Sequence, residues 1–141
     1  MVSCSNEPEV LTGPFLIKNG TTYDQKTNKV ITGYTNTLYN NGQLKEKGNY
    51  INGLKTGSFE SFYDNGQLQS KGTYFYGIKN GLWENYHDNG QLHKRGHFIN
   101  NKRDGPTESF LENGELSYVE NYIDGEMFDD VVSINNENGQ P

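Results

Sequence analysis

The sequence of residues 81–98, GLWENYHDNGQLHKRGHF, decides the fold. Asn89-Gly90 lies at its centre, between two segments in which apolar and polar residues alternate. Asn-Gly in this setting is the strongest short signal for a β-hairpin, because a type I′ turn requires positive φ at both central residues. We therefore predict a hairpin over this stretch, with Asn89-Gly90 in a type I′ turn.

That turn fixes a cross-strand register, which also makes chemical sense. It predicts the pairs Asp88–Gln91, His87–Leu92, Tyr86–His93, Glu84–Arg95 and Trp83–Gly96. In the preceding hairpin it predicts the pairs Phe59–Gly72, Tyr63–Leu68 and Glu60–Lys71. Opposite charges meet in this register and large aromatic rings cover glycines, both of which favour pairing.

The hairpin belongs to an internal repeat. Asn-Gly-Gln/Glu-Leu recurs at 41–44, 65–68, 89–92 and 113–116, always 24 residues apart. Aligned on this motif, the chain shows further columns: Gly33, Gly57, Gly81 and Gly105; Gly48, Gly72 and Gly96; and Tyr50, Tyr74, Phe98 and Tyr122. Short glycine-bearing links join the hairpins, so the pattern predicts an all-β, elongated and twisted antiparallel meander of about four stacked hairpins.

The same columns divide the chain into segments. We expect a flexible tether over 1–12, lead-in strands over 13–32, hairpin repeats over 33–56, 57–80, 81–104 and 105–127, a C-terminal cap over 128–134, and a disordered tail over 135–141. Thr107 stands where the second and third repeats have Phe59 and Trp83, so the fourth repeat is a degenerate end unit that needs a cap.

Alternation along the strands predicts two different faces. The expected buried face carries Phe59, Tyr63, Leu68, Gly72 and Tyr74, then Trp83, His87, Leu92, Gly96 and Phe98. Its main structural residues are predicted to be Trp83, Phe59, Gly72, Gly96, Leu68 and Leu92. The other face is polar except for one column, here called the outer column: Leu38, Phe62, Tyr86 and Phe110. Either the outer column binds a partner protein, or the segment Phe15-Leu16-Ile17 covers it.

Composition and charge narrow the function. The 141 residues are 31% hydrophobic, yet they include 10 Tyr, 7 Phe and 1 Trp, which indicates one folded domain with a thin aromatic core. The net charge of -6 divides into +4 over residues 1–103 and -10 over 104–141. Because the basic residues are spread beside carboxylates, nucleic acid is not expected as a ligand. The acidic end either attracts a basic partner or simply keeps the surface hydrated.

The N-terminus leaves the compartment open. A small residue before Cys4 and the polar stretch after it resemble the end of a bacterial lipoprotein signal, which would make Cys4 a lipidation site. The apolar segment of such a signal is missing and no run of 18 apolar residues occurs, so the sequence as it stands predicts a cytoplasmic protein. A lipid-anchored envelope protein is the alternative. Membrane contact is expected only through a lipid or peripherally.

Two groups of residues suggest metal binding or acid/base catalysis, but the predicted register argues against both. His87 is predicted on the buried face and His93 and His97 on the other, with about 13 Å between the last two, too far to share a metal ion. Glu60, Glu84 and Glu108 form one column about 9.6 Å apart and are better explained by pairing with Lys71 and Arg95. We therefore expect no catalytic residues, no metal site and no cofactor.

The repeat resembles a known family. The pattern Gly-x-Trp/Phe-Glu-x-Phe/Tyr-x-Asp-Asn-Gly-Gln-Leu-x-x-Lys/Arg-Gly-x-Tyr/Phe is similar to the bacterial variant of MORN repeats, and the resemblance covers about residues 20–127. The resemblance implies a non-catalytic interaction module, and the bacterial members include proteins described as antitoxin-like. We thus expect a protein-binding module, with a peripheral membrane or phospholipid-binding repeat domain as the alternative.

Overall fold

The computed structural model describes residues 8–128 and 132–133, and their regular structure consists of β-strands. The strands are β1 (Phe15–Lys18), β2 (Thr21–Asp24), β3 (Gly33–Leu38), β4 (Leu44–Ile51), β5 (Leu54–Lys55), β6 (Gly57–Phe62), β7 (Leu68–Phe75), β8 (Ile78–Lys79), β9 (Gly81–Tyr86), β10 (Leu92–Ile99), β11 (Lys102–Phe110), β12 (Leu116–Ile123), β13 (Glu126–Met127) and β14 (Val132–Ser133).

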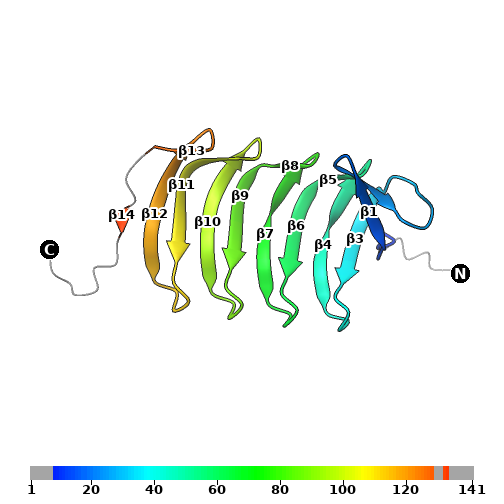
Figure 1. Cartoon of the computed structure of the whole chain (residues 1–141), viewed down its shortest axis with the longest axis horizontal. Coiled ribbons are helices and arrows are strands. Elements are labelled where there is room, and N and C mark those ends of the chain that lie inside the picture. Colours follow the sequence, from blue (N-terminus) through cyan, green and yellow to red (C-terminus); the bar gives the residue numbers. More distant parts are fainter. Residues whose placement is uncertain (1–7, 129–131, 134–141) are drawn as a thin grey trace, which may run out of the picture.

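The strands form one long antiparallel sheet with a separate hairpin at one end (Figure 1). The sheet runs in the order β3-β4-β6-β7-β9-β10-β11-β12-β13, with β5, β8 and β14 paired to β4, β7 and β12, and β1 pairs only with β2. The predicted all-β meander of stacked hairpins is confirmed. Among the described residues there is no helix long and apolar enough to cross a bilayer.

The Asn-Gly motifs form the hairpin turns, but the predicted turn type is wrong. Gly90 has φ +88°, whereas Asn89 is not among the residues with positive φ. The His87 N–H donates to the Gln91 carbonyl and the Gly90 N–H to the His87 carbonyl. These bonds define a three-residue loop, a type I turn closed by a glycine bulge. The Asn89 side chain supports it by accepting from the Gln91 N–H.

The glycine bulge shifts the register next to each turn by one residue, and a second bulge, at His93 in one hairpin and Gln69 in another, restores it farther along the strands. Beyond it the predicted pairs are correct: Glu84 faces Arg95, Trp83 faces Gly96, Phe59 faces Gly72 and Glu60 faces Lys71. Next to the turn the pairing slips by one residue, because Leu92 faces Tyr86 and Leu68 faces Phe62. The predicted pairs His87–Leu92, Tyr86–His93 and Tyr63–Leu68 are therefore wrong.

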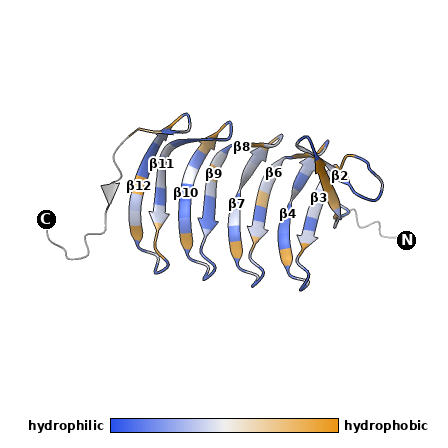
Figure 2. Ribbon diagram, in the orientation of Figure 1, coloured by the Kyte–Doolittle hydropathy of each residue, from blue (hydrophilic) through white to orange (hydrophobic). Residues whose placement is uncertain are grey.

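Leu68 and Leu92 consequently do not belong to the predicted buried face. Directly opposed residues in an antiparallel pair share a face, so both leucines lie beside the outer column, together with Leu44 and Leu116. Figure 2 shows these residues as an apolar band at the lower ends of β4, β7, β10 and β12.

Type I′ geometry occurs instead at the other end of the hairpins, in the links. Asn52-Gly53 has φ of +49° and +77°, and Asn100-Asn101 has +50° and +67°. Asparagine tolerates the left-handed region better than most residues, so Asn101 can replace the linker glycine. Tyr76 takes the same conformation with φ +46°, which is unusual for a bulky side chain.

The core consists of the buried Ile31 and a chain of aromatic rings along the sheet. Tyr50, Phe59 and Trp83 are 5%, 4% and 5% exposed, and Tyr74 and Phe98 pack against them. Successive rings meet edge to face, with centroid distances of 6.0 Å for Tyr50–Phe59, 5.4 Å for Phe59–Tyr74 and 5.0 Å for Tyr74–Trp83. Each such contact adds about 0.5–1.5 kcal/mol beyond burial, so the rings join the first hairpin to the second and the second to the third.

Each large ring covers a glycine, although not the glycine predicted. A Cβ on Gly72 would lie 2.2 Å from the Trp83 ring, and one on Gly48 would lie 2.1 Å from the Phe59 ring. The ring thus packs on the preceding hairpin rather than on its own cross-strand partner. Gly96 instead would meet Thr107, whose Oγ1 lies at 2.6 Å. By contrast, a Cβ on Gly81 would meet open space. Glycine is favoured at this position because of its φ of +90°, which residues with a side chain rarely adopt.

The N-terminal residues close the first edge of the sheet. The Leu11 N–H donates to the Tyr34 carbonyl, and the Asn36 N–H donates to the Leu11 carbonyl. Phe15 packs against the buried aromatic cluster, while Leu16 and Ile17 stay exposed. Figure 1 shows β1 in front of the first strands of the sheet.

At the opposite edge β14 pairs with β12 at Val119–Val132. Cys4 and the tail 135–141 lie outside the described residues.

Gly72→Ala tests which ring covers this glycine. The new Cβ would overlap Trp83, so we expect a loss of about 1–3 kcal/mol in the free energy of unfolding, measured by urea denaturation. The loss should shrink in a Trp83→Leu background, because the smaller side chain can give way. If the loss shrank in a Phe59→Leu background instead, the ring that covers Gly72 would be Phe59 of the same hairpin, as the sequence predicts.

Candidate functional site

The long sheet presents two chemically different faces, because little of it is covered by a second layer. The aromatic face carries Tyr50, Phe59, Tyr74, Trp83 and Phe98. The outer face carries the glutamate column and the outer column. Either face can receive a ligand.

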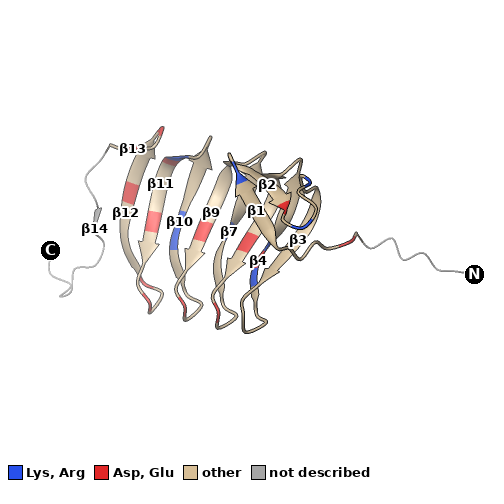
Figure 3. Cartoon of the chain, turned by 45° about the vertical axis from the view of Figure 1, so that its right-hand side comes forward, with Lys and Arg blue, Asp and Glu red and all other residues tan. Residues whose placement is uncertain are grey.

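A row of ion pairs crosses the middle of the outer face. It joins adjacent hairpins: Lys47 to Glu60 at 2.7 Å, Lys71 to Glu84 at 2.9 Å, and Arg95 to Glu108. Figure 3 shows acidic and basic positions alternating across these strands. The predicted partners within one hairpin face each other in register, yet the ion pairs form with the base of the preceding hairpin.

The Lys71–Glu84 pair shifts the pKa values of both its members in the direction expected for an ion pair. The hydrogen bond from Lys71 to Glu84 raises the pKa of the ammonium group. Burial opposes ionisation of Glu84, but its bonds to Lys71 and Tyr86 outweigh burial and lower the pKa of the carboxyl group. Glu84 is therefore charged and paired, an arrangement that stabilises the sheet rather than one poised for proton transfer.

The outer column lies beside this row. Leu38 is 56% exposed, whereas Phe62, Tyr86 and Phe110 are half-buried. A basic group of the ion-pair row lies near each aromatic ring of the column, with Lys71 Nζ 5.8 Å from the Tyr86 centroid and Arg95 5.5 Å from the Phe110 centroid. The segment Phe15-Leu16-Ile17 does not supply the cover proposed for this column, since Phe15 packs on the opposite face.

A more exposed apolar row lies at the other end of the same face, and the sequence analysis missed it. Phe75, Ile99 and Ile123 are 62%, 52% and 59% exposed and recur every 24 residues. We call these three residues the distal row. Alternation from Lys71 and Thr73 places Phe75 on the outer face. The column was visible in the sequence, but it stands at the strand ends, where alternation alone does not reveal exposure.

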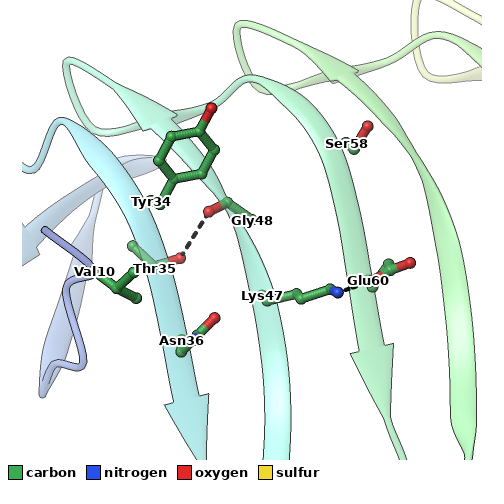
Figure 4. A pocket seen from close by; sticks show the side chains of 8 residues that line it. All are labelled: Val10, Tyr34, Thr35, Asn36, Lys47, Gly48, Ser58 and Glu60. Carbon is green, nitrogen blue, oxygen red and sulfur yellow. Dashed lines mark hydrogen bonds and ion pairs between the residues drawn. The ribbon is translucent and has the colours of Figure 1, made fainter. Parts of the chain in front are cut away.

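Shallow grooves lie between the two apolar rows, one at each of three successive hairpin junctions. Their volumes are about 410, 300 and 380 Å³. The first is bordered by Val10, Tyr34, Ser58 and the Lys47–Glu60 ion pair (Figure 4). The third is bordered by Leu82, Pro106, Arg95 and Glu108. The outer face thus combines apolar rows, paired charges and repeated grooves.

The aromatic face carries a row of cations that sequence reasoning also missed. Lys55 Nζ lies 4.0 Å from the Phe59 centroid and Lys79 Nζ lies 4.1 Å from the Trp83 centroid. Arg103 lies 5.8 Å from the Phe98 centroid and 5.4 Å from that of Tyr122. The three positions are again 24 residues apart. We call them the cation row.

The Asn-Gly end of the sheet is held by bonds between repeats. The Tyr39 and Tyr63 hydroxyls each donate to a backbone carbonyl of the next hairpin, at Phe62 and Tyr86, over 2.7 Å. His87 Nε2 makes the equivalent contact to the Phe110 carbonyl at 2.9 Å. The fourth repeat has Leu111 at this position, which cannot donate, in keeping with its place at the end of the array.

The histidines are arranged differently from the prediction. The His87 and His93 rings lie 4.3 Å apart, because the bulge brings His93 to the side of His87. Their predicted separation onto opposite faces is wrong. Burial, His87 and Lys94 together lower the pKa of His93. Among the described residues no group of three or more His, Cys, Asp or Glu side chains is placed to hold a metal ion.

Tyr63→Phe removes one bond of this ladder. We expect a loss of about 0.5–1.5 kcal/mol in stability, the usual worth of a hydrogen bond whose acceptor is left partly buried. Tyr34→Phe is the control, since Tyr34 is more than half exposed. Equal melting temperatures of the two variants would show that the ladder contributes nothing.

His93→Gln tests the lowered pKa of His93, and Gln is the residue at the same position of the second repeat. A histidine whose pKa is lower in the folded state than its unfolded value of about 6.5 contributes stability above that pH and loses it as the pH falls. The variant should therefore melt at a higher temperature than the parent at pH 5, with a smaller difference at pH 8. His97→Gln controls for the loss of an exposed histidine. The same difference at both pH values would contradict the assignment.

Comparison with known proteins agrees with this architecture. A family model described as MORN repeat variant matches residues 32–52, 55–75, 79–100 and 103–124, which is more than half of the chain. No curated protein matches the chain. Members of this family are in general non-catalytic repeat modules, and many bind membranes or phospholipids. With four matched repeats on a meander of hairpins, this chain belongs to the MORN repeat variant family.

Proposed function

We propose that this protein is a non-catalytic module that binds a partner protein through its outer face. The observation that carries the proposal is the distal row, whose three apolar side chains are each more than half exposed and aligned along one face. Isolated exposed apolar residues are ordinary on a protein surface, but an aligned row of them with a polar surround is typical of an interface.

The rest of the outer face supports the same reading. The outer column Leu38, Phe62, Tyr86 and Phe110 supplies aromatic groups of the kind that dominate binding energy at interfaces. The ion-pair row between the two apolar rows supplies polar groups in fixed positions. The grooves at successive hairpin junctions can accommodate side chains of the partner. A binding surface built this way can extend over several repeats.

The charge of the turns suggests a partner with basic groups. Asp64, Asp88 and Glu112 follow one another along the Asn-Gly edge and are exposed, and Glu115 lies in the last of these turns. Such a line of acidic groups steers a positively charged protein during association. An antitoxin-like role, in which the partner is a toxin, is the finer form of this proposal and makes the basic protein its target.

Binding of a membrane through the same face is the alternative to binding of a protein. A bilayer would need exposed basic groups next to the apolar residues, whereas the bases of the outer face are held in ion pairs. Vesicle binding that requires the distal row would therefore replace the protein-binding proposal with a peripheral membrane one.

The proposal is tested with the purified partner, identified by cross-linking to the parent protein and then titrated by calorimetry. Phe75→Ser with Ile99→Ser should weaken binding by at least about 30-fold, the effect of losing interface hot spots. Phe62→Ala with Tyr86→Ala should weaken it comparably. The melting temperature of the distal-row variant should change little, because its side chains are exposed.

Leu16→Ser with Ile17→Ser is the matched control, since it removes two exposed apolar groups from the N-terminal hairpin. Unchanged affinity in both outer-face variants would contradict the proposal. Steep weakening by salt with no effect of either variant would assign binding to the acidic edge alone.

A further inference from the structure

The aromatic face contains an electrostatic imbalance that the outer face does not. On the outer face the bases of the central row are paired with carboxylates of the neighbouring hairpin. On the aromatic face Lys55 Nζ lies 3.6 Å from Glu46 Oε2, and Arg103 Nη1 lies 3.9 Å from Glu120 Oε2. The positive charges of these two end members of the cation row are therefore only loosely paired with carboxylates. Within 8–128 and 132–133, Lys79 has no carboxylate at ion-pair distance.

Lys79 lies between two aromatic rings, as do the other two members of the row. Its ammonium group lies 4.1 Å from the Trp83 centroid and 5.3 Å from the Phe98 centroid, so two rings flank it. Burial lowers the pKa of Lys79, and the positive charges of Lys55 and Arg103 lower it further. Three cations therefore repel one another along one line, and the central one has aromatic faces as its neighbours in place of a counter-ion.

We propose that the cation row binds an acidic polypeptide segment of a partner protein, with Lys79 at the centre of the contact. Carboxylates placed along the row would relieve the mutual repulsion and supply the counter-ion that Lys79 lacks. The three cations lie on successive hairpins, which places neighbours about 9.6 Å apart, twice the spacing of adjacent strands. A segment contacting all three must span about 19 Å, or about six extended residues.

The depth of the cations favours a polypeptide over a membrane surface. The side chains of Lys55 and Arg103 are only 28% and 29% exposed, because they lie along the rings rather than project from the sheet. A side-chain carboxylate can reach such a group, whereas a flat bilayer cannot approach it closely.

This surface is separate from the one in the proposed function, so the two can fail independently. Trp83 is the only tryptophan of the chain and lies directly beneath Lys79, which makes its fluorescence a reporter of the row. The probe is a decapeptide of alternating Glu and Ala, and its analogue with Gln in place of Glu controls for charge. We expect the acidic peptide to change Trp83 emission saturably and the Gln analogue to leave it unchanged.

Lys79→Gln should weaken binding of the acidic peptide about tenfold, and Lys79→Arg should restore it, because Arg keeps the charge. Lys71→Gln is the matched control, since Lys71 lies on the opposite face in an ion pair. Circular dichroism checks the fold of each variant. We expect Lys79→Gln to retain the folded state, because it removes a charge that burial and the neighbouring Lys55 and Arg103 disfavour.

Two results would overturn the inference. One is peptide binding that is equally weakened by Lys71→Gln and Lys79→Gln, which would reduce the effect to overall charge. The other is a Trp83 response to vesicles containing phosphatidylserine but not to the peptide, which would assign the row to a membrane surface. Outer-face variants should leave peptide binding unchanged, so a failure here says nothing against the partner proposed for that face.

Discussion

The fold depends on the contact between a ring of one hairpin and a glycine of the hairpin before it. Phe59 lies on Gly48 and Trp83 lies on Gly72, so close that a side chain on either glycine would overlap the ring. The contact lowers each ring into the sheet, and there it meets Tyr50 or Tyr74 edge to face. A sheet of this length has little apolar material to bury, so the stacking of hairpins has to supply the burial that a second layer supplies elsewhere.

The same contact determines what the aromatic face can do. Because the rings lie flat and low, the Lys55 and Lys79 side chains can cross above them and keep the face partly covered without a second layer. Long basic side chains thus serve as the cover of the core, and they leave a line of positive charge on the surface. In the fourth repeat Thr107 replaces the ring, and its hydroxyl is buried without a hydrogen-bond partner among the described residues. The regular pattern therefore ends there, next to the degenerate end of the array.

The two ends of each hairpin are held by different means, and this accounts for the shape of the outer face. At the Asn-Gly end, side chains such as Tyr63 and Asn65 donate to carbonyls of the next repeat, which locks the loops in a row. At the other end, the link turns expose Phe75 and Ile99. Apolar residues near the loops are half-buried by this ladder, whereas those near the links are open to solvent. The outer face is consequently more accessible at its link end than the outer column alone suggests.

The sequence by itself determined the repeat, the meander and the pairing of residues remote from the turns, because a 24-residue period with Asn-Gly at fixed positions admits few other arrangements. It also identified Phe59 and Trp83 as core residues. Only the tertiary structure decided the turn type, since type I with a bulge and type I′ accept the same Asn-Gly pair and differ in the φ of Asn89. That one-residue difference moved Leu68 and Leu92 to the outer face and placed His93 beside His87. Only the tertiary structure likewise decided which residue each ring and each glutamate contacts. The cross-strand residue of the same hairpin and the equivalent residue of the preceding hairpin lie at similar distances, and strand alternation carries no information about contacts between hairpins.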